Sequence, residues 1–330
     1  MNLHDPLLSG KARRLATPVT PTGSRHVTVL MGVRDGAAFL ESQLASIASQ
    51  RHEDWSVVVA DDGSRDESVE IVRRFAAAHA ARTVRLVAGP GRGFQANFLR
   101  LLSEIPAAAR YVAFADQDDV WLPDRLGHGL EVLATTDPGR PALYGARTVL
   151  TDENLVPRGR SPRFHRPPSF RNALVQSIAG GNTMLMNRAA ADLLCAAAVR
   201  TDRIVSHDWW AYQLVSGAGG QVIYDERPTV LYRQHGGNLV GAGAGVRAKL
   251  RRMAALWRGD FSDYTDTNLL ALEGVRDLLA PENMALVSAL RTAREAPLFQ
   301  RLGQLGRAGL YRQRMAGTAV LWAAAVLGRL

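Results

Sequence analysis

The stretch YVAFADQDDVW, residues 111–121, joins a predicted buried strand to a cluster of acidic residues. Its first residues are mostly apolar and predict a short buried strand that runs directly into three carboxylates, Asp116, Asp118 and Asp119. Like charges this close repel one another, so the turn requires a group that compensates for them.

Similar apolar runs occur on the N-terminal side of this stretch, separated by helical patterns. Strands are predicted within VTVLMGV (27–33), WSVVVADDGS (55–64) and TVRLVAG (83–89), with a helix after each. Apolar strands that alternate with helices imply an α/β fold, a mostly parallel Rossmann-like sheet covered by helices on both faces. Ligands bind beyond the carboxyl ends of such strands, where both acidic clusters, DDGS and DQDD, are expected.

Composition and charge limit the possible classes of protein. The 330 residues are 47% hydrophobic and 22% charged, as in an ordinary globular chain. The single cysteine, Cys195, allows no disulfide within the chain, which fits a cytoplasmic location. The net charge of +9 comes from the two ends, because residues 31–240 carry equal numbers of basic and acidic residues.

Three regions are expected: a flexible leader (1–25), the α/β domain (26–240) and a basic helical C-terminal region (241–330). The C-terminal region shows no strand signal and predicts two to four helices built onto the domain. Its last apolar run, MAGTAVLWAAAVLGRL, is shorter than the roughly 18–20 residues needed to span a bilayer. Two interpretations stay open, a helix packed on the core or one that meets a membrane surface beside Arg307, Arg312 and Arg314.

The acidic clusters have two interpretations each. An Asp-x-Asp turn can aim two carboxylates at one divalent cation such as Mg²⁺, or it can be a solvated turn in which Asp119 caps the next helix. Asp61 and Asp62 can accept hydrogen bonds from a nucleobase and a ribose, or belong to an ordinary strand-to-helix turn. GPGRGFQANF (89–98) is similar to a phosphate-binding glycine loop but lacks the Lys-Ser/Thr of an ATPase loop.

Taken together, the ordered motifs between residues 27 and 241 resemble a family 2 glycosyltransferase with the GT-A fold. The motifs that carry the resemblance are VVVADDGSRDES, GRGFQANFLRLL, YVAFADQDDVWLPDRL, IAGGNTMLMNRAA, SHDWW and LYRQHGGNLVG. The FADQDDVW, HDWW and YRQHGGN segments are most similar to the branch of bacterial rhamnosyltransferases.

The resemblance implies a role for each matching position. The donor nucleotide would be bound by Asp61, Asp62, Gly93, Asn97 and Asp116, with Val33 and Asp35 at the end of the first strand. The metal, Mg²⁺ or Mn²⁺, would be held by Asp116, Asp118 and His235, with Arg233 on the diphosphate. The acceptor or sugar would contact Gly181, Asn182, His207, Trp209 and Trp210. Asp208 would be the catalytic base, although Asp208 could also cap its helix and His235 could be a buried structural histidine.

One departure from the family pattern lies at the end of the first strand. The usual Thr-Tyr-Asn-like triplet is replaced here by Val33, Arg34 and Asp35. Arg34 is expected either to reach a phosphate or to pair with an acidic neighbour.

The function implied is inverting transfer of a sugar, with rhamnose suggested, from a nucleoside-diphosphate donor to a polysaccharide or lipid-linked acceptor. The basic ends would keep the enzyme at the inner face of the membrane. Two alternatives are a metal-dependent sugar nucleotidyltransferase and a nucleic-acid-binding protein. The nucleotidyltransferase lacks a long glycine-rich loop after the first strand. Nucleic-acid binding is not expected, because the basic excess is split between the two ends.

Overall fold

The computed structural model describes residues 25–236 and 260–330. The expected leader, except for Arg25, and residues 237–259 around the start of the expected C-terminal region lie outside these residues. The strands are β1 Val27–Val33, β2 Trp55–Asp61, β3 Val84–Ala88, β4 Tyr111–Ala115, β5 Val120–Trp121, β6 Ala142–Thr151, β7 Pro157–Arg160, β8 Leu185–Asn187 and β9 Gln221–Arg233.

The helices follow the strands as the sequence predicts in the first half of the chain. They are α1 Ala37–Ala48, α2 Ser68–Ala78, α3 Phe94–Leu102, α4 Arg125–Leu133, α5 Phe170–Ala173, α6 Arg188–Ala198, α7 His207–Gly217, α9 Asp260–Glu273, α10 Pro281–Glu295, α11 Leu298–Ala308 and α12 Met315–Val326. Four of these helices belong to the C-terminal region, where the described residues contain no strand.

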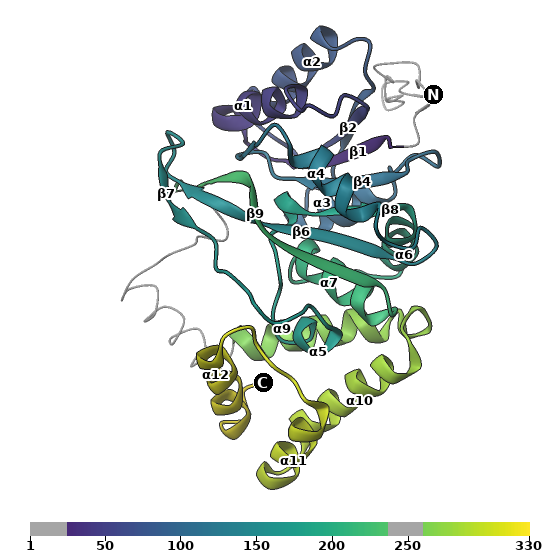
Figure 1. The fold of residues 1–330 in the computed structure, drawn as a ribbon, viewed down its shortest axis with the longest axis vertical. Coiled ribbons are helices and arrows are strands. Elements are labelled where there is room, and N and C mark those ends of the chain that lie inside the picture. Colours follow the sequence, from purple (N-terminus) through teal and green to yellow (C-terminus); the bar gives the residue numbers. More distant parts are fainter. Residues whose placement is uncertain (1–24, 237–259) are drawn as a thin grey trace, which may run out of the picture.

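The strands form one sheet in the order β3-β2-β1-β4-β8-β6-β9-β5, with β7 paired to β6 (Figure 1). β1 to β4 run parallel, β8 is antiparallel to both of its neighbours, and β6 runs parallel to β9. The predicted mixed, mostly parallel sheet is therefore confirmed. β6, β8 and β9 were not predicted from the sequence.

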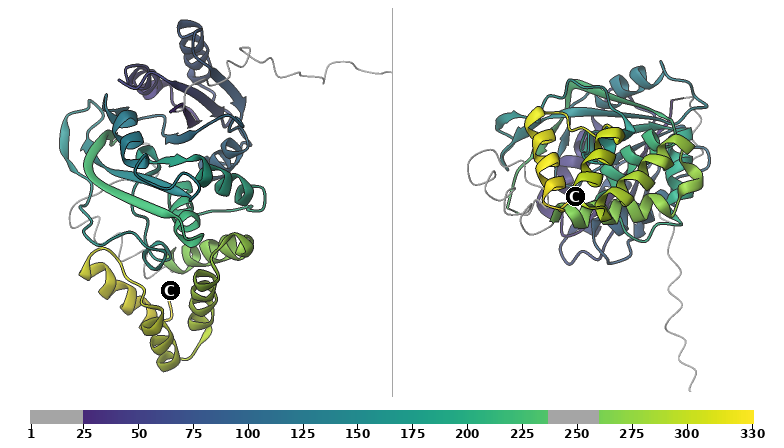
Figure 2. Two further views of the ribbon diagram at one scale, coloured as in Figure 1. Left: turned by 45° about the vertical axis from the view of Figure 1, so that its right-hand side comes forward. Right: turned by 90° about the horizontal axis from the view of Figure 1, so that it is seen from below.

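Apolar side chains alternate between the two faces of the sheet and build a core on each. On one face Met31 and Val59 pack with α1, α2 and α4. On the other face Leu30 and Val58 pack with α3, α6 and α7. This second core continues into the C-terminal helices through residues such as Leu272, so these helices cover the domain at the lower end of the molecule (Figure 2).

The register brings the carboxyl ends of the parallel strands to a common edge. Val33 at the end of β1 lies opposite Asp61 on β2, and Met31 lies opposite Ala115 on β4. The residues that follow these strands, including Asp62 and Asp116, therefore emerge at the same edge of the sheet, on either side of β1, as the sequence predicts.

The last helix, α12, packs on the protein, which is the first of the two interpretations that the sequence left open. Leu321, Ala324 and Ala325 are buried, which confirms that it packs on the protein. In the part of the chain that the structure describes, no helix is both long and apolar enough to cross a membrane.

Candidate functional site

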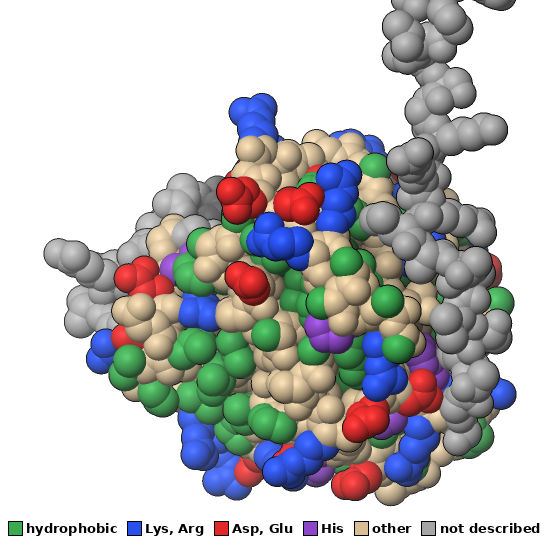
Figure 3. All heavy atoms as spheres, turned by 90° about the horizontal axis from the view of Figure 1, so that it is seen from above, with side chains coloured by type: hydrophobic (Ala, Val, Ile, Leu, Met, Phe, Trp, Pro, Cys, Tyr) green, Lys and Arg blue, Asp and Glu red, His purple; other side chains and the backbone are tan. Residues whose placement is uncertain are grey.

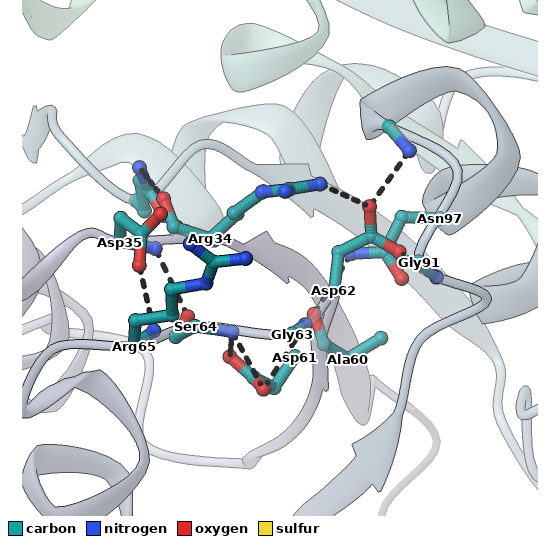
Figure 4. Close-up of polar contacts among 12 residues, drawn as sticks. Arg34, Asp35, Ala60, Asp61, Asp62, Gly63, Ser64, Arg65, Gly91 and Asn97 are labelled. Carbon is teal, nitrogen blue, oxygen red and sulfur yellow. Dashed lines mark hydrogen bonds and ion pairs between the residues drawn. The ribbon is translucent and has the colours of Figure 1, made fainter.

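Asp62 organises the glycine loop at the end of β2. Its carboxylate is buried and accepts hydrogen bonds from the backbone N–H groups of Gly91 (2.6 Å) and Gly93 (2.7 Å) (Figure 4). A guanidinium nitrogen of Arg34 lies 3.7 Å from the same carboxylate. The expected pairing of Arg34 with an acidic neighbour is thus present. Because both of its carboxylate oxygens bind the glycine loop, Asp62 shapes this edge of the sheet mainly by holding the backbone of that loop.

Asp61 and Asp35 hold the neighbouring turn. The Asp61 carboxylate accepts from the N–H groups of Gly63 and Ser64 at 3.2–3.3 Å, and that of Asp35 accepts from the N–H of Arg65 at 2.7 Å. Asp35 has a left-handed backbone (φ 47°), which non-glycine residues seldom adopt. The side chain of Val33 is buried in the core, so any contact of Val33 with a nucleotide must come from its backbone.

Asn97 and Gly93 lie where the glycine loop joins α3. Asn97 is buried, and its Nδ2 donates to the carbonyl of Ala60 at 2.8 Å. Gly93 precedes α3 with φ 93°, a conformation that favours glycine. Asn97 therefore fixes α3 against the end of β2, and its side chain does not face an open donor site.

The three acids after β4 have different surroundings. Asp118 contacts His235, with 2.9 Å between Oδ2 and Nε2. Asp119 is fully buried and accepts hydrogen bonds from the side chain of Asn182 and the backbone N–H of Arg233. Burial, and next the charge of Asp118, raise the pKa of Asp119 to about 8. The expected Asp119 helix cap is not formed.

The carboxyl of Asp116 is affected by the charges of its neighbours in the turn and of Asp208, a residue far along the chain. Burial raises the pKa of its carboxyl well above the usual value, and the charges of Asp119, Asp118 and Asp208 raise it further. Arg125 acts in the opposite direction. No described residue makes a hydrogen bond to the Asp116 carboxylate. The expected base, Asp208, is therefore near enough to the Asp-x-Asp turn for its charge to be felt there.

Arg125 and Gln117 are two functional residues that the sequence reasoning missed. The guanidinium of Arg125 is fully buried, lies 3.5 Å from the Trp121 ring centre and donates to the carbonyls of Phe114, Asn182 and Met184. Burial lowers its pKa to about 9. The side-chain amide of Gln117 accepts a hydrogen bond from the N–H of Arg34 (2.8 Å) and donates one to the carbonyl of Arg34 (3.0 Å). The three acidic residues of the turn need a positive charge to compensate for their repulsion, and this need could have indicated a buried cation such as Arg125.

Arg233 binds protein groups at the turn. Its guanidinium donates to the carbonyl of Asp118 (2.9 Å), to the Ser42 hydroxyl (3.0 Å) and to the carbonyl of Glu153, and it lies 4.5 Å from the Phe39 ring centre. This geometry differs from the expected contact with a diphosphate. Arg233 instead fixes the backbone of the acidic turn.

The start of α7 contains the expected base and three expected acceptor contacts. Asp208 is half-buried, and its Oδ1 accepts from the N–H of Trp209 at 2.7 Å. Trp209 is half-buried and donates from Nε1 to the carbonyl of Ala173. Trp210 is fully buried. Trp210 therefore cannot stack on a sugar, because its ring is part of the core.

His207 and the glycine turn that faces it are also internal. The His207 ring stacks on Phe98 at 3.6 Å and meets Phe114 edge-on at 5.0 Å. Within residues 25–236 and 260–330 neither ring nitrogen has a hydrogen-bond partner, and burial lowers the pKa of His207 to about 4. Gly181 packs against this ring, and Asn182 is bound to Asp119. These residues support the site from behind, so the expected direct contacts of His207 and Asn182 with an acceptor are not available.

The charges around Asp116 suit a divalent cation. Several carboxylates at one strand end, one of them without a hydrogen-bond partner among the described residues, offer the hard oxygen ligands that Mg²⁺ and Mn²⁺ prefer. Among the described residues, no group of three or more His, Cys, Asp and Glu side chains is arranged to hold a metal. The expected trio of Asp116, Asp118 and His235 does not form such a group, although Nε2 of His235 lies 2.9 Å from Oδ2 of Asp118. The residues fit a cation held by one or two carboxylates.

Comparison with known proteins agrees with this arrangement. Residues 28–194, half of the chain, match the family described as Glycosyl transferase family 2. The chain belongs to glycosyl transferase family 2. This family match contains the edge with Asp62, Asp116 and Asp118, whereas Asp208, Arg233 and His235 follow it.

Similar proteins of known description extend the comparison. The chain is 26% identical over 241 residues to "dTDP-rhamnosyl transferase RfbG" of Shigella flexneri, covering 68% of this chain and 78% of that protein. It is 20% identical over 137 residues to "UDP-Glc:alpha-D-GlcNAc-diphosphoundecaprenol beta-1,3-glucosyltransferase WfgD" of Escherichia coli, covering 42% of this chain and 51% of that protein.

A solved structure shares the fold of this family 2 glycosyltransferase. It is the mannosyltransferase PcManGT from Pyrobaculum calidifontis in complex with GDP-Man and Mn²⁺, with a TM-score of 0.52 and 19% identity. The match covers 97% of this chain and 85% of that chain. The GT-A fold is thereby confirmed.

Proposed function

We propose that this chain transfers a sugar from a nucleoside-diphosphate donor to a hydroxyl of a polysaccharide or lipid-linked acceptor, with inversion at the anomeric carbon. Membership of glycosyl transferase family 2 supports the reaction class. The observation that carries the proposal is that the start of α7 lies against the end of β4: His207 meets Phe114 edge-on at 5.0 Å, and besides burial the charge of the adjacent Asp208 raises the pKa of Asp116. A base and a donor site must meet at one point.

Asp208 is the proposed base. Its Oδ1 accepts the N–H of Trp209, and its Oδ2 makes no hydrogen bond with a described residue. A carboxylate in this position takes the proton of the acceptor hydroxyl while the hydroxyl oxygen attacks the anomeric carbon. The bond from that carbon to the donor diphosphate breaks as the new bond forms. A single displacement of this kind inverts the carbon and requires no nucleophile from the protein.

Asp116 and Asp118 are the proposed ligands of Mg²⁺ or Mn²⁺. When bound, such a cation supplies Lewis-acid stabilisation of the departing diphosphate. Asp62 and the loop from Gly91 to Gly93 shape the donor side, and Arg34 lies beside Asp62 at the exposed edge. Its half-exposed guanidinium is positioned to meet a phosphate if it leaves Asp62.

The similarity to a dTDP-rhamnosyl transferase supports dTDP-rhamnose as the donor to test first. The similarity to a transferase that acts on a diphosphoundecaprenol acceptor supports a lipid-linked acceptor. Such an acceptor would place the enzyme at the inner face of the membrane, in the synthesis of cell-envelope glycans.

A thermal-shift screen of nucleoside-diphosphate sugars with Mg²⁺ or Mn²⁺ tests the donor. A ligand at about 100 times its Kd adds about 2.7 kcal/mol of stability. Asp118→Ala should lose the metal-dependent shift. Asp208→Asn should keep the shift and lose sugar transfer, whereas Asp202→Asn, a change at an exposed aspartate six residues earlier, should keep both. Normal transfer by Asp208→Asn would show that the base is misassigned.

The same preparation separates the alternative functions. A nucleotidyltransferase would form a nucleoside-diphosphate sugar and pyrophosphate from a nucleoside triphosphate and a sugar phosphate. A nucleic-acid-binding protein would retard DNA or RNA in a gel at physiological salt. Either result, without a shift by any nucleotide sugar, would replace the proposed function.

A further inference from the structure

Helix α12 is apolar on its outer side as well as its inner side. Leu321, Ala324 and Ala325 are buried. On the other side Met315, Val320 and Val326 expose 81%, 47% and 51% of their surface. A helix on the surface of a water-soluble domain normally presents polar residues to the solvent, so this outer side calls for an apolar environment.

The start of α11 continues the same exposed surface. Phe299 is 86% exposed, and Leu298 beside it is also exposed. Arg301 ties this region to the end of α12, because its guanidinium donates to the carbonyls of Ala296 and Ala325 at 2.9 Å each. We use the term C-terminal apolar face for Leu298, Phe299, Met315, Val320, Val326 and Leu327.

The charges around the C-terminal apolar face are mostly positive, with two acids, Asp266 and Glu295, beside Arg301 near the end of α12. Residues 296–330 contain five arginines and no aspartate or glutamate. Arg307 and Arg314 are exposed and make no ion pair with a described residue. The nearest acids on α9, Asp266 and Glu273, are bound to arginines of α10. The opposite end of the molecule is different, since acidic and basic side chains alternate there (Figure 3).

We propose that the C-terminal apolar face docks on an anionic lipid bilayer. An apolar helix face bordered by cations lies flat at the boundary of headgroups and acyl chains and is attracted by anionic lipids. The 12 residues of α12 extend about 18 Å, too short to cross a hydrocarbon layer of about 30 Å. The excess of arginines in residues 296–330, with Arg307 and Arg314 exposed, favours an anionic lipid surface over a second copy of this chain, whose matching face would carry the same net charge.

This inference deepens the proposed function, because it names the surface that would bring the site to a lipid-linked acceptor. Its test needs no turnover. The full-length protein is mixed with vesicles of phosphatidylcholine alone or with 30% phosphatidylglycerol, and the bound fraction is measured by flotation. The expected result is binding to the anionic vesicles that weakens as salt is raised.

Variants assign the binding to the face. The double variant Phe299→Glu/Val320→Glu should bind anionic vesicles at least tenfold more weakly. Val199→Glu makes the same type of change at a residue that is 79% exposed at the end of α6, and it should bind normally. Each of Arg307→Gln and Arg314→Gln should weaken binding about fivefold, whereas Arg74→Gln on α2 should have no effect. The basic segments outside the described residues are unchanged in every variant.

The outcomes separate this inference from the proposed function. Vesicle binding that is unchanged in Phe299→Glu/Val320→Glu, or no binding by the wild-type chain, overturns the docking surface. A wild-type dimer that this variant converts to a monomer, without vesicle binding, overturns it as well and assigns the face to contacts between copies. Loss of vesicle binding with retained metal-dependent donor binding supports the inference. Normal vesicle binding without any nucleotide-sugar binding contradicts only the proposed function.

Discussion

Adding one methyl group at Gly181 should disrupt the wall behind the site. A Cβ atom on Gly181 would lie 2.1 Å from Nε2 of His207 and 2.9 Å from two ring carbons. An ordinary contact requires about 3.4 Å, so the ring would have to move by about 1.3 Å (3.4 minus 2.1). The ring cannot move freely, because it is stacked on Phe98 and meets Phe114.

The expected cost of Gly181→Ala follows from this geometry. Overpacking of a full core costs about 1–3 kcal/mol, which corresponds to a fall in Tm of about 2–6 °C for a chain of this size. The backbone of Gly181 does not have a positive φ, so the cost is steric. Urea unfolding followed by circular dichroism measures it. Gly127→Ala is the matched control, since its Cβ would meet no atom within 4 Å in α4, and alanine favours a helix.

A second substitution tests whether His207 is the cause. Gly181→Ala/His207→Ala removes the ring that the methyl group would strike, so the double variant should be no less stable than His207→Ala alone. The two effects would then be non-additive by about 1–3 kcal/mol. A Gly181→Ala protein as stable as wild type, or a double variant whose loss equals the sum of the single losses, would refute the steric explanation.

Three further predictions concern the same edge of the sheet. Asp62→Asn should lower the free energy of unfolding by about 2 kcal/mol, because one charged acceptor of the glycine-loop N–H groups is lost; Asp61→Asn, with longer hydrogen bonds, should cost less. Arg125→Met should cost about 3–5 kcal/mol in urea unfolding, because it leaves buried acids without their cation; a loss below 1 kcal/mol would contradict this. Because the pKa of His207 is about 4 in the folded protein and 6.5 in the unfolded chain, His207 takes up a proton in the unfolded chain first as the pH falls. The free energy of unfolding is therefore unaffected by His207 above pH 6.5 and is lower by about 3 kcal/mol near pH 4. His207→Leu should flatten that part of a stability-against-pH curve, and an unchanged slope would exclude His207 as its source.

The sequence predicts the first half of the fold because β1 to β4 are short, apolar and separated by amphipathic helices. The second half does not follow these rules. β8 has only three residues, too few for a period, and β9 contains Asp225, Glu226, Arg227 and Pro228 in its middle. The pairing of β6 with β9 shifts register at these residues. Such strands are defined by their neighbours in the sheet, which one sequence does not reveal.

For the site, the sequence predicts which strand ends carry acids but not where each side chain points. Nine of the eleven residues of α7 are buried. A helix buried on nearly all sides has no polar and apolar face to compare, so His207 and Trp210 could not be recognised as internal. In contrast, the start of α7 lies near the end of β4, because His207 meets Phe114 edge-on and, besides burial, the charge of Asp208 raises the pKa of Asp116. The role of Asp208 as base stays a prediction.

The acidic turn is stabilised from the protein side for two of its three carboxylates. Asp119 accepts hydrogen bonds from the side chain of Asn182 and from the backbone N–H of Arg233, and the carboxylate of Asp118 is hydrogen-bonded to the ring of His235. Asp116 has the buried charge of Arg125 nearby but no hydrogen-bond donor among the described residues, while three other acids raise its pKa. Among the described residues, Asp116 is thus the one carboxylate of the three that no side chain or backbone group binds, which is why it is the ligand to test first in the proposed cation site.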